Sequence, residues 1–513
     1  MISTIKLLAL GAGAAVLAAA LPAEAQKAQD ALRVAYTDPI STTNGFFDPK
    51  PETAAVQRAV YSTLIVYDPT TRTFKPDLAT AWKRVGPTTL EFTLRQGVTW
   101  HDGTPFTADD VVDTFNWLVD PKTRLRFGFI YTSRFAKAEK VDDRTVRVEE
   151  KGVFADDLMT IAVNLTIFPK HVIDTFANKA DFAREKPIGT GPYKVVSISP
   201  STGVKLVKFD KYVSPGPWRP AASISKIDIL PIPDLQTEMA QLMTGGIDLM
   251  HDVPRDQALQ IVSNPDYKMT VAQGLNVFYM NMDAAGRSGN KALTDVRVRK
   301  ALEMAVDRQA LAKNVAPPGA TTPNAICVPV MIGCAVSNAP PAHDVAGAKK
   351  LLAEAGYPNG FDVDMVSNPG GEQISEAIAG QLREAGVRAK VEHLTFAGYR
   401  ARQVAGKLEL LIGNWDAGGT PDEASTVNFF WDGGARDYAR DKEILKLGEE
   451  ATRERDAEKR DALYRKIFDI NNEKAYDLPL TTFPAVFVHT KDLKVETDTI
   501  GALAVDYARL QWQ

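Results

Sequence analysis

The most suggestive pair of side chains in this sequence is a tryptophan followed directly by an aspartate, Trp415 and Asp416. They follow the mostly apolar run 408–412, which is typical of a buried strand. Gly418 and Gly419 come directly after them, and glycine can adopt backbone conformations that other residues rarely adopt. An aromatic face beside a carboxylate suits a ligand with an apolar body and a cationic or hydroxyl group. A structural role is equally open, with the indole packed under the loop and the carboxylate capping the next turn.

Catalytic motifs are absent from the sequence, which contains no GxSxG, HExxH, GxxxxGK(S/T) or GxGxxG pattern. His101 beside Asp102 fits a turn between a strand and a helix better than a catalytic pair. We therefore expect no catalytic residue, no metal ligand and no cofactor, with an exported hydrolase of unrecognised type as the alternative. The histidines lack metal-ligand spacing; they are His101, His171, His251, His343, His393 and His489.

The N-terminus has the layout of a secretory signal peptide, with Lys6, an apolar run over 7–21, and small residues at Ala23 and Ala25. The run is shorter than the roughly 20 residues that a spanning helix needs, so cleavage after Ala25 is expected in preference to an uncleaved anchor. No cysteine near this point offers a site for a lipid. The predicted mature protein is soluble, periplasmic and not lipid-anchored.

The two cysteines, Cys327 and Cys334, are separated by VPVMIG, which does not fit the CxxC spacing of a zinc or thioredoxin-like site. In an oxidising compartment, this spacing favours a local disulfide over two free thiols.

Length and periodicity predict several domains. The chain of 513 residues corresponds to two to four domains, and its net charge of −4 without a long basic run argues against a nucleic-acid partner. Alternation over 90–95 predicts a strand, and Thr107 with Asp110 predicts a capped helix over 108–119. The Pro- and Gly-rich segment 187–192 marks a boundary between structural units.

The second half of the chain is more regular. Thr294 is expected to cap one helix that continues to about 315, and Asp344 is expected to cap a helix over 345–356. Strands and helices then alternate over 361–415, the pattern of a parallel sheet wrapped by helices. Ligands of open α/β sheets bind beyond the carboxyl ends of the strands, and Trp415 lies at such an end.

Several segments, in order, resemble the extracellular solute-binding protein family 5, which comprises the peptide, nickel and opine binding subunits of ABC importers. The resemblance extends from about Leu32 to Val488, nearly the whole mature chain. It rests on TLIVYDPTTRTFKPDLATAWKR, LEFTLRQGVTWHDGTPFTADDVVDTF, PIGTGPYKV, QLMTGGIDL, ALTDVRVRKALEMAVDR and AKKLLAEAGYPNGFDV.

This resemblance implies an α/β fold, the two-lobed type II periplasmic-binding-protein clamp with an extra inserted domain. The solute would lie between the lobes, which two crossings near 271 and 481 would join. The expected division is a signal peptide over 1–25, lobe I over 26–55, 190–270 and 482–513, an inserted domain over 56–189, and lobe II over 271–481.

The implied function is capture of a peptide or peptide-like small solute and its delivery, by a monomer, to an ABC permease at the inner membrane. A non-peptide solute such as an opine or a sugar, with a chemosensory role, is the alternative within the same fold.

The family's peptide binders carry an aspartate three residues after the tryptophan, and this aspartate pairs with the amino terminus of the peptide. Trp415 matches the tryptophan, but Gly418 stands where the aspartate would be, so Asp416 or Asp422 would have to replace it. Five further ligand contacts are expected: Thr43, Asn44 and Phe46 after the first strand, and Asn276 and Tyr279 at the entry to lobe II.

Overall fold

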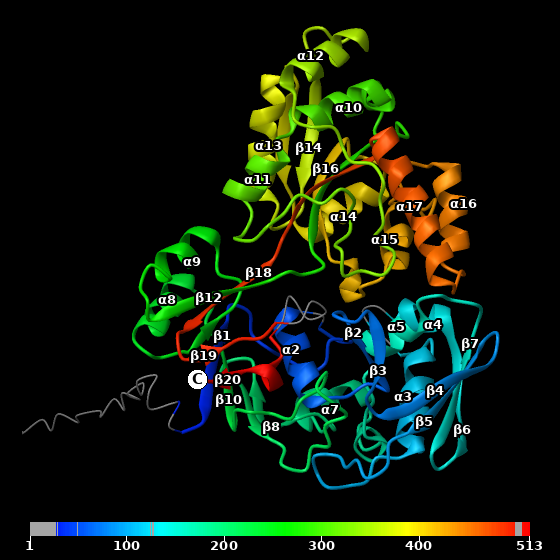
Figure 1. Cartoon of the computed structure of the whole chain (residues 1–513), viewed down its shortest axis with the longest axis vertical. Helices are drawn as coiled ribbons and strands as arrows, with labels where there is room; N and C mark the ends of the chain where they lie inside the picture. Colours follow the sequence, from blue (N-terminus) through cyan, green and yellow to red (C-terminus); the bar gives the residue numbers. More distant parts are fainter. Residues whose placement is uncertain (1–26, 28, 49, 124, 126–127, 498–504) are drawn as a thin grey trace, which may run out of the picture.

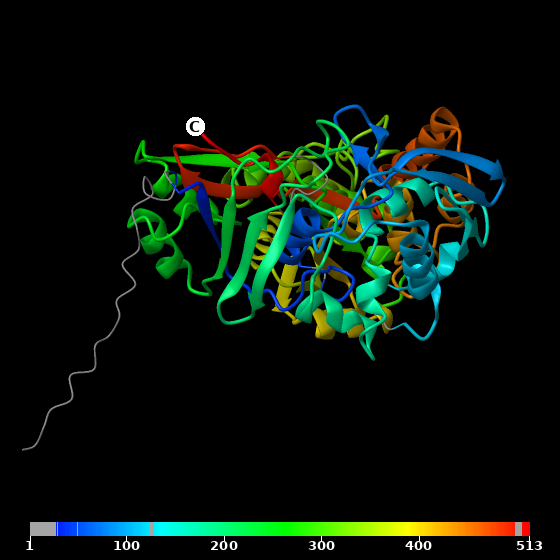
Figure 2. The same ribbon diagram turned by 90° about the horizontal axis from the view of Figure 1, so that it is seen from below.

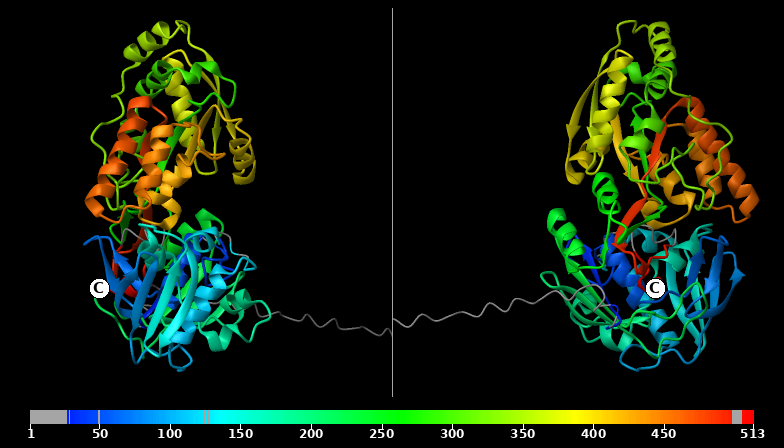
Figure 3. Two further views of the ribbon diagram at one scale, coloured as in Figure 1. Left: turned by 90° about the vertical axis from the view of Figure 1, so that its right-hand side faces the viewer. Right: turned by 60° about the vertical axis from the view of Figure 1, so that its left-hand side comes forward.

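The computed structural model describes residues 27, 29–48, 50–123, 125, 128–497 and 505–513. They form two bodies, which lie one above the other in Figures 1 and 3. The lower body contains both ends of the described chain, and the upper body contains the segment between them from β13 to β17. The predicted signal peptide lies outside the described residues. Among those residues, no helix has the length and apolar character needed to cross a membrane.

A seven-stranded sheet in the order β12-β18-β11-β1-β10-β9-β8 forms the centre of the lower body. β1 runs parallel to β10 and β11, so the carboxyl ends of these three strands share one edge of the sheet. We call it the lower carboxyl edge. The elements of this part are β1 (Ala31–Tyr36), α2 (Pro51–Val60), β8 (Tyr193–Ser199), β9 (Gly203–Lys208), β10 (Lys226–Pro231), α8 (Leu235–Met243), β11 (Leu249–Met250), α9 (Arg255–Ile261), β12 (Tyr267–Ala272), β18 (Ala485–Thr490), β19 (Leu493–Lys494), η5 (Tyr507–Arg509) and β20 (Gln511–Trp512).

A four-stranded antiparallel sheet, β4-β5-β7-β6, lies beside the first sheet in the view from below (Figure 2). The sequence predicted its helix α3 (Ala108–Val119) correctly, because Thr107 and Asp110 form the expected capping box. The predicted strand is β5 (Thr89–Leu94). The other elements here are β2 (Ile65–Asp68), β3 (Thr73–Pro76), β4 (Ala79–Gly86), α4 (Phe129–Arg134), β6 (Phe135–Asp142), β7 (Thr145–Glu150), α5 (Asp157–Met159), η1 (Thr160–Asn164), α6 (Lys170–Ile173), η2 (Lys179–Asp181) and α7 (Phe182–Glu185).

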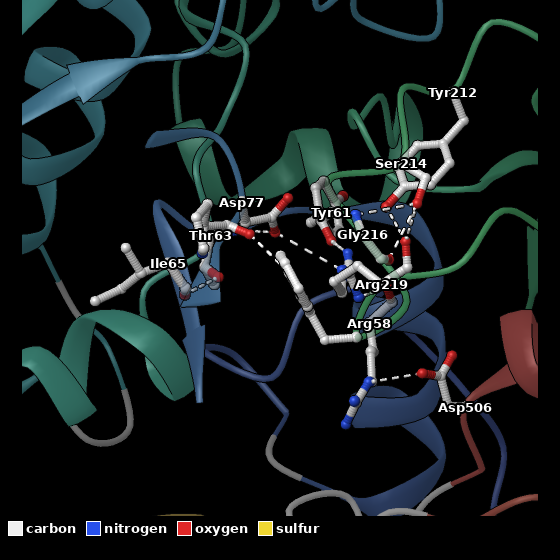
Figure 4. A network of polar contacts seen from close by, with 12 residues as sticks. Arg58, Tyr61, Thr63, Ile65, Asp77, Tyr212, Ser214, Gly216, Arg219 and Asp506 are labelled. Atoms are coloured by element: carbon white, nitrogen blue, oxygen red, sulfur yellow. Dashed lines mark hydrogen bonds and ion pairs between the residues drawn. The ribbon is translucent and has the colours of Figure 1, made fainter. Parts of the chain in front are cut away.

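Buried polar contacts gather around the end of α2 in the lower body (Figure 4). The Arg219 guanidinium, 6% exposed, donates hydrogen bonds to the carbonyl oxygens of Arg58 and Tyr61. Its Nε lies 3.7 Å from the carboxylate of Asp77, which follows β3. Burial raises the pKa of Asp77 to about 6, and Arg219 opposes that rise. One arginine thereby joins the helix end to the segment after β3.

The segment 187–192 passes directly over the end of α2. Gly191 donates its N–H to the Val60 carbonyl over 2.8 Å. A Cβ at Gly189 would lie 1.9 Å from that same oxygen, so only glycine fits this close approach.

The upper body is built on a five-stranded sheet in the order β15-β14-β16-β13-β17. β14 runs parallel to β15 and β16, as the alternating pattern predicted, but β13 and β17 add antiparallel pairs. The carboxyl ends of β14, β15 and β16 form what we call the upper carboxyl edge. The elements are β13 (Val277–Met282), η3 (Lys291–Thr294), α10 (Val296–Ala305), α11 (Arg308–Asn314), α12 (Val345–Glu354), β14 (Asp362–Ser367), α13 (Glu372–Glu384), β15 (Arg388–His393), α14 (Phe396–Val404), β16 (Leu410–Trp415), η4 (Ala417–Gly419), α15 (Glu423–Phe430), α16 (Lys442–Ala451), α17 (Ala457–Lys474) and β17 (Asp477–Thr482).

The single helix expected after Thr294 is two helices in the structure. Asp295, not Thr294, caps α10, and the helix ends where Val306 adopts an extended conformation. Asp307 then caps α11 by accepting a hydrogen bond from the N–H of Ala310. The capping aspartate offers the backbone an alternative to continuing the first helix.

The chain passes between the two bodies twice. It leaves the seven-stranded sheet at the end of β12 and enters the five-stranded sheet at β13, and it returns between β17 and β18. The two connecting segments, 273–276 and 483–484, lie side by side, because Phe483 donates its N–H to the Asn276 carbonyl over 2.9 Å. Two short adjacent connections of this kind are typical of a hinge.

Candidate functional site

The upper carboxyl edge places chemically useful side chains beside the lower body. β16 ends at Trp415, and the chain then turns through η4 into α15. Figure 1 shows α15 at the end of the upper body that adjoins the lower body. Because open α/β sheets bind ligands beyond the carboxyl ends of their strands, this edge is the natural position for a binding site.

Trp415 is half-buried and belongs to an aromatic stack. Its indole lies on the ring of Phe429, with ring centres 4.1 Å apart and planes inclined by 27°. Its Nε1 donates to the hydroxyl oxygen of Thr426 over 3.0 Å. The indole is therefore held in a fixed orientation by α15 while part of its surface stays accessible. A rigid aromatic surface of this kind suits stacking against a ligand.

Two arginines flank the same stack. The guanidinium carbon of Arg436 lies 4.6 Å from the ring centre of Phe429, and that of Arg400, on α14, lies 5.5 Å from it. Both side chains are partly exposed, and Arg400 also contacts the rings of Phe396 and Tyr399. Guanidinium groups held on aromatic faces can bind carboxylates with two parallel hydrogen bonds. We call this group, Arg400, Trp415, Phe429 and Arg436, the aromatic–guanidinium cluster.

The loop after Trp415 is a tight turn. Ala417 adopts a left-handed conformation with φ of 54°, and Gly419 follows with φ of 73°. Gly419 donates its N–H to the carbonyl of Asp416, and Gly418 lies inside the same turn. The turn contacts the lower body, because Thr420 accepts a hydrogen bond from the side-chain amide of Asn164 over 3.0 Å.

Asp422 is not available as a replacement for the family's amine-binding aspartate in this structure. Its side chain is 1% exposed and forms an ion pair with Arg460 of α17. It also caps α15 by accepting a hydrogen bond from the N–H of Ala424 over 2.9 Å. Both contacts are structural, so Asp422 holds two helices together rather than facing a ligand.

Thr43, Asn44 and Phe46 lie within the lower body. The Thr43 hydroxyl donates to the carbonyl of Ala183, and the Asn44 side chain accepts a hydrogen bond from the Phe46 N–H. Phe46 packs edge-on against Phe168 with ring centres 5.6 Å apart. These three side chains are at most 7% exposed, and each of these contacts is internal to the lower body.

Tyr279 is also internal to its body. It is 1% exposed, and its ring covers Gly413, where a Cβ would lie 2.7 Å from the Tyr279 hydroxyl oxygen. Asn276 lies on the first connecting segment and is 7% exposed. Its Oδ1 has no hydrogen-bond partner among the described residues. Asn276 is therefore better placed than Tyr279 to contact a molecule between the bodies.

An ion cluster joins the bodies at the other end of their contact. Arg455, between α16 and α17, lies 3.1 Å from Glu150 and 3.3 Å from Asp157 of the lower body. Arg84 pairs with the same two carboxylates. Burial and the neighbouring Asp157 raise the pKa of Glu150 to about 8. We call these four side chains the interbody ion cluster.

Cys327 and Cys334 form a disulfide, with Cα atoms 5.7 Å apart. Glu423 lies close enough that the three residues could in principle share a metal ion, and they are the one such group among the described residues. Sulfurs joined to each other do not act as thiolate ligands, so this group does not suit a metal.

Sequence reasoning missed Arg400, Phe429 and Arg436. Arg400 was detectable, because α14 begins directly after β15 and its first residues therefore lie near the upper carboxyl edge. Phe429 and Arg436 reach the site only through the packing of α15, which no local pattern indicates.

Comparison with known proteins agrees with this architecture. The model of the bacterial extracellular solute-binding proteins, family 5, matches residues 73–437. The glutathione-binding protein GsiB of Salmonella typhimurium is 29% identical over 421 residues, covering 79% of this chain and 80% of that protein.

Two solved structures share the fold. HbpA2 from Haemophilus parasuis has a TM-score of 0.81 at 23% identity, covering 94% of this chain and 100% of that one. The periplasmic binding protein DppA from Helicobacter pylori, in complex with the peptide STSA, has a TM-score of 0.76 at 24% identity, covering 95% of this chain and 99% of that one.

The fold and the site at the edge of its sheet define a two-lobed α/β solute-binding protein. The chain belongs to the bacterial extracellular solute-binding proteins of family 5.

Proposed function

We propose that this protein is the periplasmic binding subunit of an ABC importer and captures a peptide-like solute that carries at least one carboxylate. The observation that carries the proposal is the aromatic–guanidinium cluster at the upper carboxyl edge. Arg400 and Arg436 supply positive charge for a carboxylate, while Trp415 supplies a flat apolar surface. The glutathione and peptide ligands of the similar proteins are molecules of this kind.

In this proposal the two bodies are the lobes of a clamp. Residues 26–55, 190–270 and 482–513 form lobe I, residues 56–189 form an inserted domain, and residues 271–481 form lobe II. The solute binds between the lobes, and a permease then binds the closed form with higher affinity than the open form.

Within lobe II, Trp415 stacks on the solute, and Asp416 with the backbone at Gly418 contacts a polar group. Asn276 offers its Oδ1 from the connecting segment. Thr43, Asn44, Phe46 and Tyr279 support the site from within the cores of their bodies.

The test is a thermal-shift panel with glutathione, dipeptides, tripeptides, an opine and a neutral disaccharide. Binding to the folded state alone stabilises it by mass action, about 2.7 kcal/mol at a hundredfold excess over the dissociation constant. For a chain of this size, we expect glutathione or a peptide to raise the melting temperature by on the order of 5 °C. This rise in melting temperature should be absent in the double variant Arg400→Met/Arg436→Met.

Stabilisation by the disaccharide alone would overturn the proposal in favour of a sugar receptor. Formation of a cleaved product from the stabilising compound would overturn it in favour of the exported hydrolase. Mass spectrometry of the incubated solution distinguishes the second case from simple binding.

A further inference from the structure

A cavity of about 500 Å³ lies between the two bodies beside the segments that connect them. One wall comes from α9 of the lower body, and the other comes from α11 and the segment 318–322 of the upper body. In the view of Figure 1, α9 and α11 lie to the left of β18, and α15 lies to its right. The cavity, which we call the hinge cavity, has a volume that suits a small organic ligand.

Strand pairing separates the hinge cavity from the candidate site at Trp415. Trp415 pairs with Val277 of β13, and Val277 pairs on its other side with Thr482 of β17. Thr482 in turn donates its N–H to the carbonyl of Thr321 over 2.8 Å, and Thr321 lines the cavity. β13 and β17, which lead into the two connecting segments, therefore stand between the cavity and Trp415. The hinge cavity lies on the far side of the hinge from the aromatic–guanidinium cluster.

Contacts with the lower body and with the first connecting segment hold one wall of the cavity in place. Arg255 of α9 donates a hydrogen bond to the Ala316 carbonyl over 3.2 Å, and the side-chain amide of Gln273 donates to the Gly319 carbonyl over 2.8 Å. Gly319 has a φ of 81°, and a Cβ there would lie 2.8 Å from the side chain of Val271. Glycine thus permits this close approach, and the wall is formed before any ligand binds.

The charged side chains among the described residues that line the hinge cavity are both cations. Arg255 comes from the lower body and Lys313 from the upper body. Within the described part of the chain, neither forms an ion pair with a carboxylate. Gln309, Thr321 and Thr322 add neutral groups that can donate hydrogen bonds. Two cations beside one cavity repel each other, and an anion between them would offset this repulsion and accept hydrogen bonds from both.

We infer that the hinge cavity binds a small multivalent anion, a polycarboxylate or a phosphate compound, through Arg255 and Lys313. An anion that contacts both cations favours the arrangement in which both line one cavity, which is the arrangement of this structure. The interbody ion cluster is formed in the same arrangement. The anion should therefore also raise the affinity for the solute, an effect that rests on the proposed function, whereas the anion site itself does not.

Calorimetry at constant ionic strength tests the anion site, with citrate and pyrophosphate as probes. The parent protein for these titrations is Arg400→Met/Arg436→Met, so that the probes do not bind at the aromatic–guanidinium cluster. At least one probe should bind, and the tighter probe shows whether the cavity prefers carboxylates or phosphates. Adding Arg255→Gln/Lys313→Gln should weaken binding about tenfold or more, because two charge-assisted hydrogen bonds are lost. Lys313→Gln alone, at an exposed position that leaves the Arg255 contact intact, should weaken it about threefold.

Lys226→Gln/Lys350→Gln is the matched control, because it removes one exposed lysine from each body at positions that do not line the cavity. This change should alter the affinity less than about twofold. Equal losses in the two double variants would mean that the anion responds only to net charge, and would overturn the site. Absence of binding by both probes, or equally tight binding of the uncharged trimethyl ester of citrate, would overturn it as well.

The effect on the solute is measured with the peptide that most raises the melting temperature. The ratio of its affinity with and without saturating anion should be about threefold higher in the wild type than in Arg255→Gln/Lys313→Gln. Competition at the aromatic–guanidinium cluster affects both proteins equally, so it cancels from this comparison. Equal ratios would overturn the coupling. Failure of the wild type to bind any peptide would overturn the proposed function and not the anion site, which is titrated without peptide.

Discussion

Trp415 is the residue on which the proposed ligand contact depends most. One face of its indole is covered by Phe429, and its Nε1 is bound to Thr426, so the ring is already ordered before a ligand arrives. An ordered aromatic group loses little entropy on binding, which is why such residues often dominate interface energies.

Trp415→Ala should weaken binding of the stabilising peptide by about 2 kcal/mol, or about thirtyfold, when measured by calorimetry well below the melting temperature. Trp415→Phe should lose much less binding free energy, because an aromatic ring still stacks on Phe429. Trp431→Phe is the control, since Trp431 is 2% exposed and donates to Asp477 inside the upper body. If Trp415→Ala lowers only the melting temperature and leaves affinity unchanged, the indole has a structural role.

Glu303 provides a prediction on pH that does not depend on any ligand. Burial raises its pKa to about 8, with Arg308 opposing the rise. Because the folded-state pKa lies above the unfolded value, the folded state binds the proton more tightly. The resulting stabilisation is complete below about pH 4.5 and is lost as the pH rises toward 8.

Glu303→Gln resembles the protonated acid at every pH. The stability of this variant relative to the wild type should therefore increase between pH 5 and pH 8, by at least about 1 kcal/mol for a shift of one pKa unit or more. Urea unfolding at the two pH values measures it. A difference that does not change with pH would mean that Glu303 ionises normally in the folded protein.

The sequence indicated the position of some candidate site residues in the fold but not of others, for identifiable reasons. Trp415 could be placed at a strand end because the apolar run before it indicates a buried strand. Thr43 and Asn44 are polar loop residues, which suggests exposure, yet Tyr61, Ala183 and Thr166 satisfy them inside the core. Such long-range partners leave no local trace in the sequence.

At the scale of elements, sequence patterns predicted the features that depend on contacts between residues close together in the chain. The capping box predicted the start of α3, and the alternation of strands and helices predicted the parallel part of the upper sheet. The antiparallel pairing of β13 with β16 joins residues far apart in the chain, which periodicity does not reveal. The break after α10 is not apparent from periodicity, because Asp307 also fits an exposed position within one continuous helix.

The interbody ion cluster should act on the lifetime of the closed state. Arg455→Met removes a cation shared by Glu150 and Asp157, and its side chain is 27% exposed, so we expect a modest loss of about 1 kcal/mol. The dissociation rate of the bound peptide should rise about fivefold in stopped-flow measurements. Arg453→Met, at an exposed neighbouring position, is the control. Equal dissociation rates in both variants would show that the cluster does not restrain opening.

At the scale of the whole molecule, two adjacent connections between the bodies favour a clamp. In the described part of the chain, only 273–276 and 483–484 join the two large sheets, so rotation about them changes the separation of the two bodies without disturbing either core. The contacts of Asn164 with Thr420 and of Arg455 with Glu150 cross from one body to the other. They should form when the clamp closes and separate when it opens.

Small-angle X-ray scattering tests whether a solute is captured between the two bodies. The radius of gyration should decrease when the peptide that most raises the melting temperature is added to saturation. The decrease should be reduced for Arg400→Met/Arg436→Met at the same peptide concentration, because less of the protein is then bound. A peptide that stabilises the protein yet leaves the radius of gyration unchanged would show that it binds within one body, and would contradict the clamp.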